Sequence, residues 1–340
     1  MWKTLQTVLG RLLQAIPAII GIIIVTFILT RALPGDPAVY FAGPAADKES
    51  IAAVRHELGL DKPLLAQFFI YVNNLFHGNW GTSLTTGRSV MEELGRRFPA
   101  SIELTLCALI FAVSIALPLG VLSATRPDSW LDHMTRIVVT MGVSLPTFFT
   151  GLFFIYLFYY KLGIAPSPIG RLDVIFSSPP QVTGFYLIDS LIAGDWELFV
   201  ASLTQLILPA ITLGLFVLAP LARMTRASML QVLASDFIRT ARANGLPTKK
   251  ILFNYAFRNA LLPILTTMGM VFSFLLGSNV LVEKVFAWPG IGSFAIEALV
   301  ASDYAAVQGF VLAMAILYVT LNLLIDVAYT LVDPRVKFSG

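Results

Sequence analysis

Six stretches without a single charged side chain limit the fold of this chain more than any other feature. They cover residues 12–30, 104–125, 137–160, 198–222, 260–282 and 305–325. A helix of about 20 apolar residues crosses the hydrocarbon core of a bilayer. Because 57% of the 340 residues are hydrophobic and only 13% are charged, a water-soluble fold could not cover the apolar surface. We therefore predict an all-α membrane protein with six transmembrane helices.

The first stretch has the outline of a signal peptide, since Lys3 and Arg11 precede it. It is long enough to span a membrane, however, and the sequence PGDP at 34–37 follows it instead of a small-residue cleavage site. We predict that this helix is retained. Prolines inside the stretches predict kinked helices that pack against one another; they are Pro17, Pro118, Pro146, Pro209, Pro220 and Pro263.

Basic residues near the ends of the stretches predict the orientation of the chain. If the N-terminus is inside, the second and third outer regions contain only Lys161, Arg171 and Lys284. The inner segments then hold Lys3, Arg11, Arg126, Arg136, Arg223, Arg226, Arg239, Arg242, Lys249, Lys250, Arg258, Arg335 and Lys337. Both termini are therefore predicted to be cytoplasmic.

The stretches divide the chain into an N-terminal helix (1–31), an outer cap region (32–98), a membrane domain with the other five helices (99–332) and a cytoplasmic tail (333–340). The cap region carries helical patterns at 48–58 and 63–76, with Gly59 as a helix stop and Pro63 in a first turn. Within the membrane domain, the outer loop 161–197 is rich in Pro and Gly, which predicts an irregular path. A long inner loop occupies 224–259.

No residue pattern predicts an enzyme, a metal site or a nucleotide site on this chain. His56, His77 and His133 lack partners at ligand spacing, and Cys107 is the one cysteine, so an internal disulfide is excluded. A net charge of +3 without a basic stripe argues against nucleic-acid binding. Asp326, at the inner end of the last stretch, is either a gating group or an interfacial residue paired with a base such as Arg335.

The inner loop contains a short amphipathic helix. Ser235 is predicted to cap it, and Asp236 in its first turn has the charge that a helix N-terminus favours. Arg239 and Arg242 lie three residues apart and so face the same way. The apolar side is predicted to consist of Phe237, Ile238 and Ala241.

Glycine and proline are predicted to end this helix and start the next. Gly245 suits a left-handed helix stop, and Pro247 suits the first turn of a second helix that begins at Thr248. The first helix would then lie across the inner end of the bundle. There it could be held by a partner protein, or it could only anchor the bundle to anionic lipid headgroups.

Several motifs resemble one branch of the bacterial ABC importer permeases. The inner loop, with DFIRTARANG at 236–245 and RNALLP at 258–263, resembles the EAA loop as it occurs in the dipeptide, oligopeptide and nickel branch. PGDP at 34–37, ELGLDKP at 57–63, WPGIG at 288–292 and DPR at 333–335 follow the pattern of the same branch. The long outer loop with GFYLID at 184–189 is most similar to the dipeptide permease subunit of that branch.

This resemblance implies a type I ABC importer transmembrane fold, with a periplasmic cap region, in a bacterial inner membrane. It implies a second permease subunit as a heterodimer partner, two ATP-binding subunits that carry ATP and Mg, and a periplasmic solute-binding protein. The chain itself would hold no cofactor. The residues implied to couple it to the ATPases are Asp236, Phe237, Arg239, Thr240, Ala241, Arg242 and Gly245.

The resemblance implies an importer of short peptides, with nickel chelates, glutathione and oligosaccharides as other solutes of the branch. Docking of the binding protein is assigned to the outer regions, with Pro166, Pro168 and Gly170 in the second one. An ATP-independent secondary transporter or channel is the alternative, although scarce intramembrane charge argues against ion coupling. Candidate pore-lining residues, for which helix packing is the other interpretation, are Ser144, Thr147, Thr212, Thr225, Ser273, Ser278 and Asn279.

Overall fold

The computed structural model describes residues 13, 16–28, 37–42, 46–57, 59–301 and 303–332. These residues form helices and loops, and their only β pairing is an isolated bridge between Thr82 and Ser89. The chain divides into two compact units, the first comprising residues 1–98 and 293–323 and the second comprising 99–292 and 324–340. Each unit is described by itself.

In the first unit, the described residues between 37 and 76 form three short helices, α2 (Pro37–Ala42), α3 (Lys48–Glu57) and α4 (Leu64–Phe76). The bounds of α3 and α4 agree with the predicted helices 48–58 and 63–76 to within a residue. Gly59 has a φ of +64°, so it provides the left-handed stop that was predicted after α3. Pro63 precedes the first turn of α4 as its N-cap residue instead of lying within it. The buried side chain of Gln67 closes the connection by donating to the carbonyl oxygens of Leu60 and Lys62.

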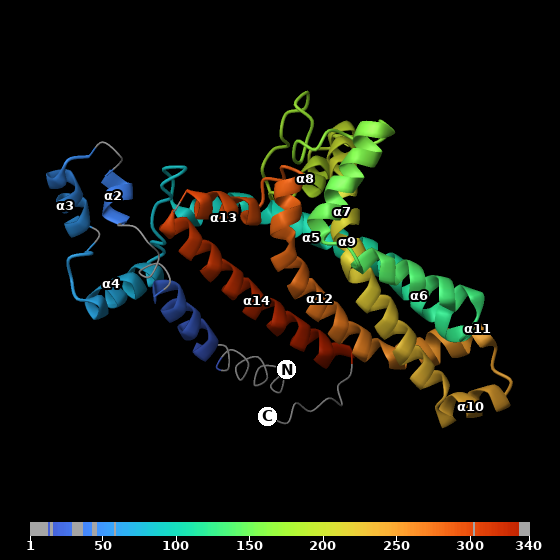
Figure 1. Ribbon diagram of the computed structural model, residues 1–340. Helices are drawn as coiled ribbons and strands as arrows, with labels where there is room; N and C mark the ends of the chain where they lie inside the picture. The colour runs from blue at the N-terminus through green and yellow to red at the C-terminus, as the bar shows by residue number, and fades with distance from the viewer. Residues whose placement is uncertain are drawn as a thin grey trace. The chain divides into compact units, whose positions relative to one another are not determined.

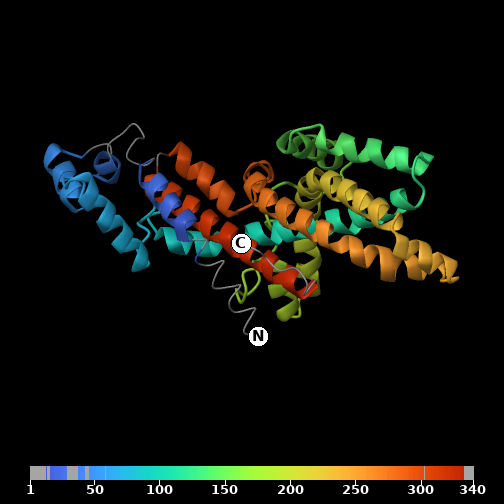
Figure 2. The ribbon, with the colours of Figure 1, turned by 90° about the horizontal axis from the view of Figure 1, so that it is seen from below.

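The second unit is a bundle in which α9 (Trp196–Leu233) packs against α12 (Arg258–Val285). The two helices run side by side in both ribbon views (Figures 1 and 2). Around them lie α6 (Trp130–Val143), α7 (Thr147–Phe154), a π-helical turn η1 (Ile155–Lys161) and α8 (Tyr186–Ile192). The short inner-loop elements are α10 (Asp236–Ala243), α11 (Thr248–Lys250) and a second π-helical turn, η2 (Ile251–Phe257). The core combines small residues such as Ala108 and Ala112 with large ones such as Leu213 and Leu275.

Three helices contribute to both units: α5 (Val90–Thr125), α13 (Ile291–Val300) and α14 (Tyr304–Val332). Within the described residues, four helical segments are long and apolar enough to cross a membrane: Val90–Thr125, Trp196–Leu233, Thr248–Val285 and Tyr304–Ile325. They contain four of the six predicted spans. The first predicted span lies partly outside the described residues, which show a helix at Ile16–Ile28.

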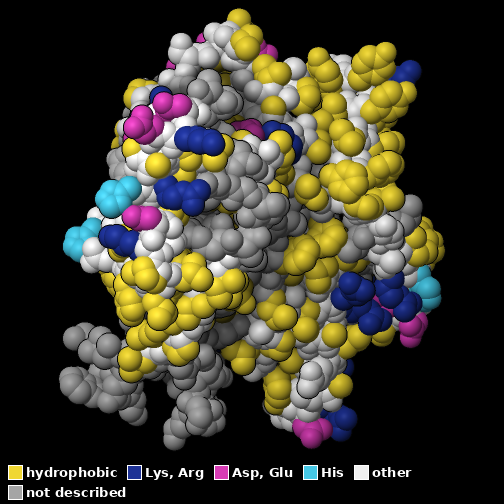
Figure 3. All heavy atoms as spheres, turned by 60° about the vertical axis from the view of Figure 1, so that its left-hand side comes forward, with side chains coloured by type: hydrophobic (Ala, Val, Ile, Leu, Met, Phe, Trp, Pro, Cys, Tyr) yellow, Lys and Arg dark blue, Asp and Glu magenta, His cyan; other side chains and the backbone are white. Residues whose placement is uncertain are grey.

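The third predicted span, 137–160, is wrong as a continuous helix. Ser144, Leu145 and Pro146 leave the helical path between α6 and α7, and Pro146 becomes the N-cap residue of α7. The residue before a proline is disfavoured in the helical region, and here the chain breaks at this position, whereas Pro118, Pro209, Pro220 and Pro263 lie inside continuous helices. Many large apolar side chains on α7 and η1, such as Phe149, Leu152 and Tyr160, are exposed. Figure 3 shows wide hydrophobic areas on one face of the molecule, with charged side chains gathered into small groups.

Candidate coupling helix and outer pocket

The amphipathic helix predicted in the inner loop is α10. It begins after Ser235 and ends at Ala243, and Gly245 follows with a φ of +70°. The backbone N–H of Leu246 donates to the carbonyl oxygen of Ala241 at 3.2 Å, which closes the left-handed stop. The start, the end and the stopping residue of this helix were therefore all predicted correctly. Pro247, predicted in the first turn of the next helix, is instead the residue before it.

Two residues attach α10 to the bundle. Ile238 is fully buried and Ala241 is nearly so. They pack in one cluster with Val121 and Ala124 of α5, Met229 of α9, Ile251 and Ala256 of η2, and Ala260 and Ile264 of α12. Figure 1 shows α10 at the lower ends of α9 and of the segment that leads into α12. α10 therefore shares one apolar cluster with three long helices, α5, α9 and α12.

The opposite face of α10 is polar and accessible. Asp236 and Arg239 form an ion pair of 3.3 Å whose side chains are almost entirely exposed, so it contributes little to stability. Thr240 and Arg242 are exposed as well. The side chain of Phe237 is 44% exposed, and the prediction that it shares the buried apolar side with Ile238 is wrong. Consecutive residues are about 100° apart around a helix, so the bundle covers Ile238 and Ala241 much more fully than it covers this ring.

Ser235 is the N-cap residue of α10, as predicted, but its side chain does not cap the helix. Its carbonyl oxygen accepts the first hydrogen bond of α10, from the backbone N–H of Arg239. Its hydroxyl instead donates to the carbonyl oxygen of Val232 at 2.6 Å, so it closes the end of α9. The start of α10 therefore has no side-chain cap and relies on Asp236 in its first turn.

A buried ion pair ties α6 to α9. The guanidinium of Arg226 donates to both carboxylate oxygens of Asp132, over 2.7 and 2.6 Å, and Asp132 is fully buried. Hydrogen bonding to Arg226 holds the pKa of the Asp132 carboxyl below its ordinary value, and Arg136 lies 3.9 Å away as a second cation. A bidentate ion pair of this kind fixes the relative orientation of the two side chains as well as the distance between them. One sequence offers no signal that these two positions meet.

The outer loop 161–197 is fixed to α5 by a second buried pair. Arg171 donates to Glu103 over 2.6 Å and to the carbonyl oxygen of Gly184 over 2.9 Å, and its guanidinium stacks on the ring of Tyr186. Glu103 also accepts a hydrogen bond from the backbone N–H of Leu187. The loop is irregular over residues 162–185, as predicted, but it then forms the short helix α8. These contacts hold both of its halves.

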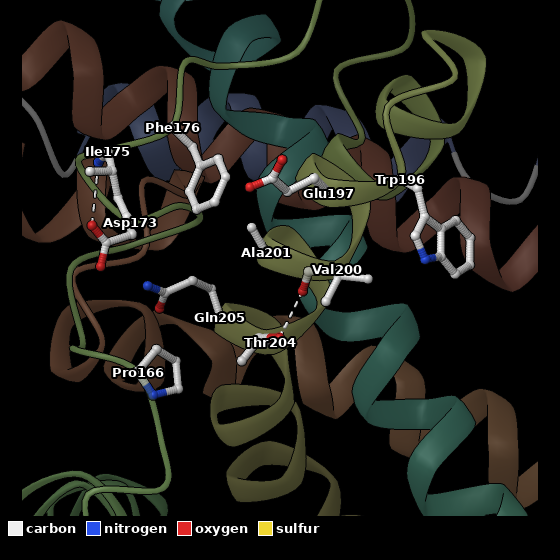
Figure 4. A pocket seen from close by; sticks show the side chains of 10 residues that line it. All are labelled: Pro166, Asp173, Ile175, Phe176, Trp196, Glu197, Val200, Ala201, Thr204 and Gln205. Carbon is white, nitrogen blue, oxygen red and sulfur yellow. Dashed lines mark hydrogen bonds between the residues drawn. The ribbon is translucent and has the colours of Figure 1, made fainter.

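The three residues assigned to docking of a binding protein occupy different environments. Pro166 and Pro168 are partly exposed. Gly170 is buried, with a φ of +106°, and a Cβ atom there would lie 3.0 Å from the carbonyl oxygen of Ala287. Gly170 therefore shapes the path of the loop from within. Pro166 also lines a pocket between this loop and the first turns of α9 (Figure 4).

A buried carboxylate that the sequence did not reveal lies behind the motif at 288–292. Glu283 accepts hydrogen bonds from the hydroxyl of Ser101 and from the amide of Asn279, and it is fully buried. Gly290 lies directly against this carboxylate, where a Cβ atom would overlap it. The indole N–H of Trp288 donates to the carbonyl oxygen of Ala100 at 2.9 Å. The motif therefore ties the segment of α5 around residues 100–101 to the C-terminal end of α12.

Other predicted positions behave as packing residues. The hydroxyls of Thr212 and Thr225 are buried and donate to carbonyl oxygens one turn earlier in α9, and Asn279 is buried in the Glu283 network. The pairing of Asp326 with Arg335 involves residue 335, which lies outside the described residues. Within the described part of the chain, no three His, Cys, Asp or Glu side chains gather in a way that could hold a metal ion.

The sequence matches two family models that together cover nearly the whole chain. Residues 116–338 match the model described as "Binding-protein-dependent transport system inner membrane component". Residues 4–105 match the N-terminal model of the same kind of membrane component.

Curated relatives are similar over almost their full length. The chain is 47% identical over 320 residues to a probable D,D-dipeptide transport system permease protein of Escherichia coli (strain K12), covering 94% of each chain. It is 43% identical over 334 residues to a di/tripeptide transport system permease protein of Pseudomonas aeruginosa (strain UCBPP-PA14), covering 98% of this chain and 99% of the relative.

Among solved structures, the chain resembles an inward-facing conformation of the MetNI methionine ABC transporter, with a TM-score of 0.51 and 18% identity. That match covers 72% of this chain and 97% of the other, and at this identity it speaks for the fold alone. The fold, the family models and the near-full-length relatives agree. The chain belongs to the family of inner membrane components of binding-protein-dependent transport systems.

Proposed function

We propose that this chain is a permease subunit of an ATP-driven importer, and that it translocates short peptides or related solutes delivered by a periplasmic binding protein. The observation that carries the proposal is the similarity, over 94% or more of the chain, to relatives named for dipeptide and di/tripeptide transport. The proposed solute class is taken from the names of those relatives. Selectivity in such systems also depends on the separate binding protein.

The proposed assembly pairs this chain with a second, different permease subunit and with two ATP-binding subunits that use ATP and Mg. Both termini would lie in the cytoplasm, with 32–98 as a periplasmic cap region and 99–332 as the membrane domain. The excess of basic residues in the inner segments supports this orientation. A tag at the C-terminus should therefore be accessible to a protease only after the membrane is opened.

In this proposal, α10 couples the bundle to an ATPase subunit. The exposed side chains of Asp236, Phe237, Arg239 and Arg242 would contact a groove on that subunit, while Ile238 and Ala241 keep the helix on the bundle. An aromatic ring exposed among charges is a typical anchor for a partner protein. ATP binding that closes the ATPase pair would then displace α10, and the shared apolar cluster would pass the displacement to α5, α9 and α12.

Docking of the binding protein is proposed for the outer side. The loop 161–197 supports this role because it is long and because its path is fixed by Arg171 and Glu103. Pro166 and Pro168 are its partly exposed contact candidates, and Gly170 would act by holding their segment in place.

The direct test is to isolate the tagged chain from its native membrane in mild detergent and to identify what accompanies it. We expect a second permease and one or two ATPase subunits, and ATP-dependent uptake of short peptides after reconstitution with the binding protein. Recovery of the chain alone, with uptake that does not respond to ATP, would refute the importer proposal.

Gly245 offers a test of the coupling role. A Cβ atom there has open space around it, so the cost of a substitution is backbone strain at φ +70°. Gly245→Val should strain the stop and lower peptide uptake per ATP hydrolysed, whereas Gly245→Asn should retain uptake because asparagine tolerates the left-handed region. Equal uptake in both variants and the parent would remove α10 from the coupling pathway.

A further inference from the structure

One side of α4 is apolar and exposed. The side chains of Leu65, Phe69 and Phe76 are 75%, 68% and 82% exposed. At about 100° per residue, these three positions fall within roughly 40° of one another around the helix, so they form a single apolar stripe. The sequence of α4 contains no charged residue. A contiguous exposed apolar surface of this kind marks a contact with lipid or with another molecule.

A different side of α4 attaches it to the N-terminal helix at Ile16–Ile28, which is the described part of the first predicted span. The ring of Phe27 is buried, and its centroid lies 5.3 Å from that of Phe68 and 5.9 Å from that of Tyr71. Figure 1 shows α4 beside this end of the N-terminal helix. Phe68 and Tyr71 lie roughly 100° around α4 from the apolar stripe, so their contact with Phe27 leaves the stripe uncovered.

The same end of the N-terminal helix lies next to the start of a second apolar helix. Gln308, near the start of α14, donates from Nε2 to the carbonyl oxygen of Thr26 at 3.4 Å. The segment Tyr304–Ile325 of α14 is long and apolar enough to cross a membrane. One apolar helix ends and another begins at this level, so we expect the boundary of the hydrocarbon core here. Because α4 packs on Phe27, the neighbour of Thr26, it lies at the same boundary.

The length of α4 decides how it can meet the lipid. Its 13 residues extend over about 20 Å, which is less than the roughly 30 Å of a hydrocarbon core. A short helix with one apolar side lies along the boundary, with that side in the lipid. A soluble protein that docks and leaves would return the apolar stripe to water each time, whereas a lipid leaflet covers it continuously.

We propose that α4 is an interfacial helix, and that its apolar stripe is inserted into the lipid leaflet in which the first predicted span ends. The region 32–98 is then in part a membrane-contacting region instead of a cap that is surrounded by water. This lipid contact goes beyond the proposed transport function, because it would be the same for any solute.

Photolabelling from the lipid tests this placement. The chain, isolated with its associated subunits, is reconstituted in phosphatidylcholine vesicles that contain a phosphatidylcholine with a diazirine on one acyl chain. After illumination, mass spectrometry gives the yield of lipid label on each segment. The yield on α4 should approach that on Tyr304–Ile325, which is the positive control. It should exceed the yield on α3, the polar helix that precedes α4, about tenfold, because the label reaches only groups at the depth of the acyl chains.

A double substitution on the apolar stripe provides the second measurement. Leu65→Asn with Phe69→Asn changes two exposed side chains, so it should leave the label on Tyr304–Ile325 unchanged. The yield on α4 should fall about tenfold, because burial of even one large apolar side chain changes partitioning by such a factor. Asn73→Gln exchanges one exposed polar side chain of α4 for another and is the matched control, which should retain the parent yield.

A parent yield on α4 that is no higher than the yield on α3 would overturn the proposal and would mean that protein covers the apolar stripe. Equal yields on α4 in the double variant and the parent would overturn it as well, because another side of the helix would then face the lipid. If the double variant also loses label on Tyr304–Ile325, it is misfolded, and Phe69→Asn alone replaces it in the same comparison.

Discussion

Replacing Ile238 with alanine should loosen α10 from the bundle. The substitution removes three carbon atoms from a side chain with no exposed surface. At about 0.8 kcal/mol per buried carbon the transfer loss is ~2.4 kcal/mol, and the cavity left in the cluster places the total within the roughly 2–5 kcal/mol typical of such changes. An eight-residue helix has little stability of its own, so the loss falls on its attachment.

Hydrogen–deuterium exchange of residues 236–243 measures this attachment. A loss of ~2.4 kcal/mol should raise the population of the detached helix about 50-fold, and amide exchange in Ile238→Ala should accelerate accordingly. Phe237→Ala is the matched control on the neighbouring residue, because its ring is 44% exposed and packs less on the bundle. It should leave exchange near the parent level while weakening recovery of the ATPase subunit.

The reverse pattern would refute this reasoning. If Ile238→Ala exchanges like the parent, the apolar cluster does not hold α10. If Phe237→Ala accelerates exchange more than Ile238→Ala does, the assignment of the buried and exposed faces is wrong.

Gly290→Ala should destabilise the chain, because its methyl group would overlap the Glu283 carboxylate, whereas Gly277→Ala has open space and should be neutral in the same thermal unfolding assay. Arg171→Met should cost about 3–5 kcal/mol by leaving a buried carboxylate unpaired, seen as a lower unfolding temperature. Burial opposes ionisation of Asp189, but hydrogen bonds from loop residues 182–184 outweigh it and lower its pKa. Its stabilisation is present above the unfolded value of about 3.9 and is lost as the pH falls through the folded value. The unfolding temperature of Asp189→Asn should therefore fall less steeply with acid than that of the parent.

Features set by neighbouring residues were predictable from the sequence. The ends of α3 and α10 follow from Gly59 and Gly245, because only a few backbone bonds decide where a helix stops. The inner loop was therefore predicted in its elements and nearly in its bounds. The prediction failed at two residues that can adopt either of two local structures. Pro146 ends one helix and precedes the next instead of kinking a continuous helix. The hydroxyl of Ser235 donates to a carbonyl oxygen of α9 instead of capping α10.

Features set by distant residues were not predictable from one sequence. Glu103 and Glu283 lie at the edges of apolar stretches, directly before residue 104 and directly after residue 282, and the local pattern does not say whether they are buried. In the structure both are buried, because Arg171 reaches the first and Ser101 and Asn279 reach the second. Nothing in the local pattern says which segments meet. The same holds for Phe237, whose exposure depends on where the bundle touches α10.

The length of α9 determines how far its ends move when the helix tilts. Its 38 residues form one helix of about 57 Å, which begins at the pocket with Trp196 and ends at Leu233, three residues before α10 begins. Because the helix is this long, a tilt of roughly 5° about one end moves the other end by about 5 Å. Pro209 and Pro220 lie inside α9, and a bend of the helix at either proline would reduce the displacement of the far end. The pocket and α10 thus lie at opposite ends of one continuous helix, so a tilt of α9 changes their positions together.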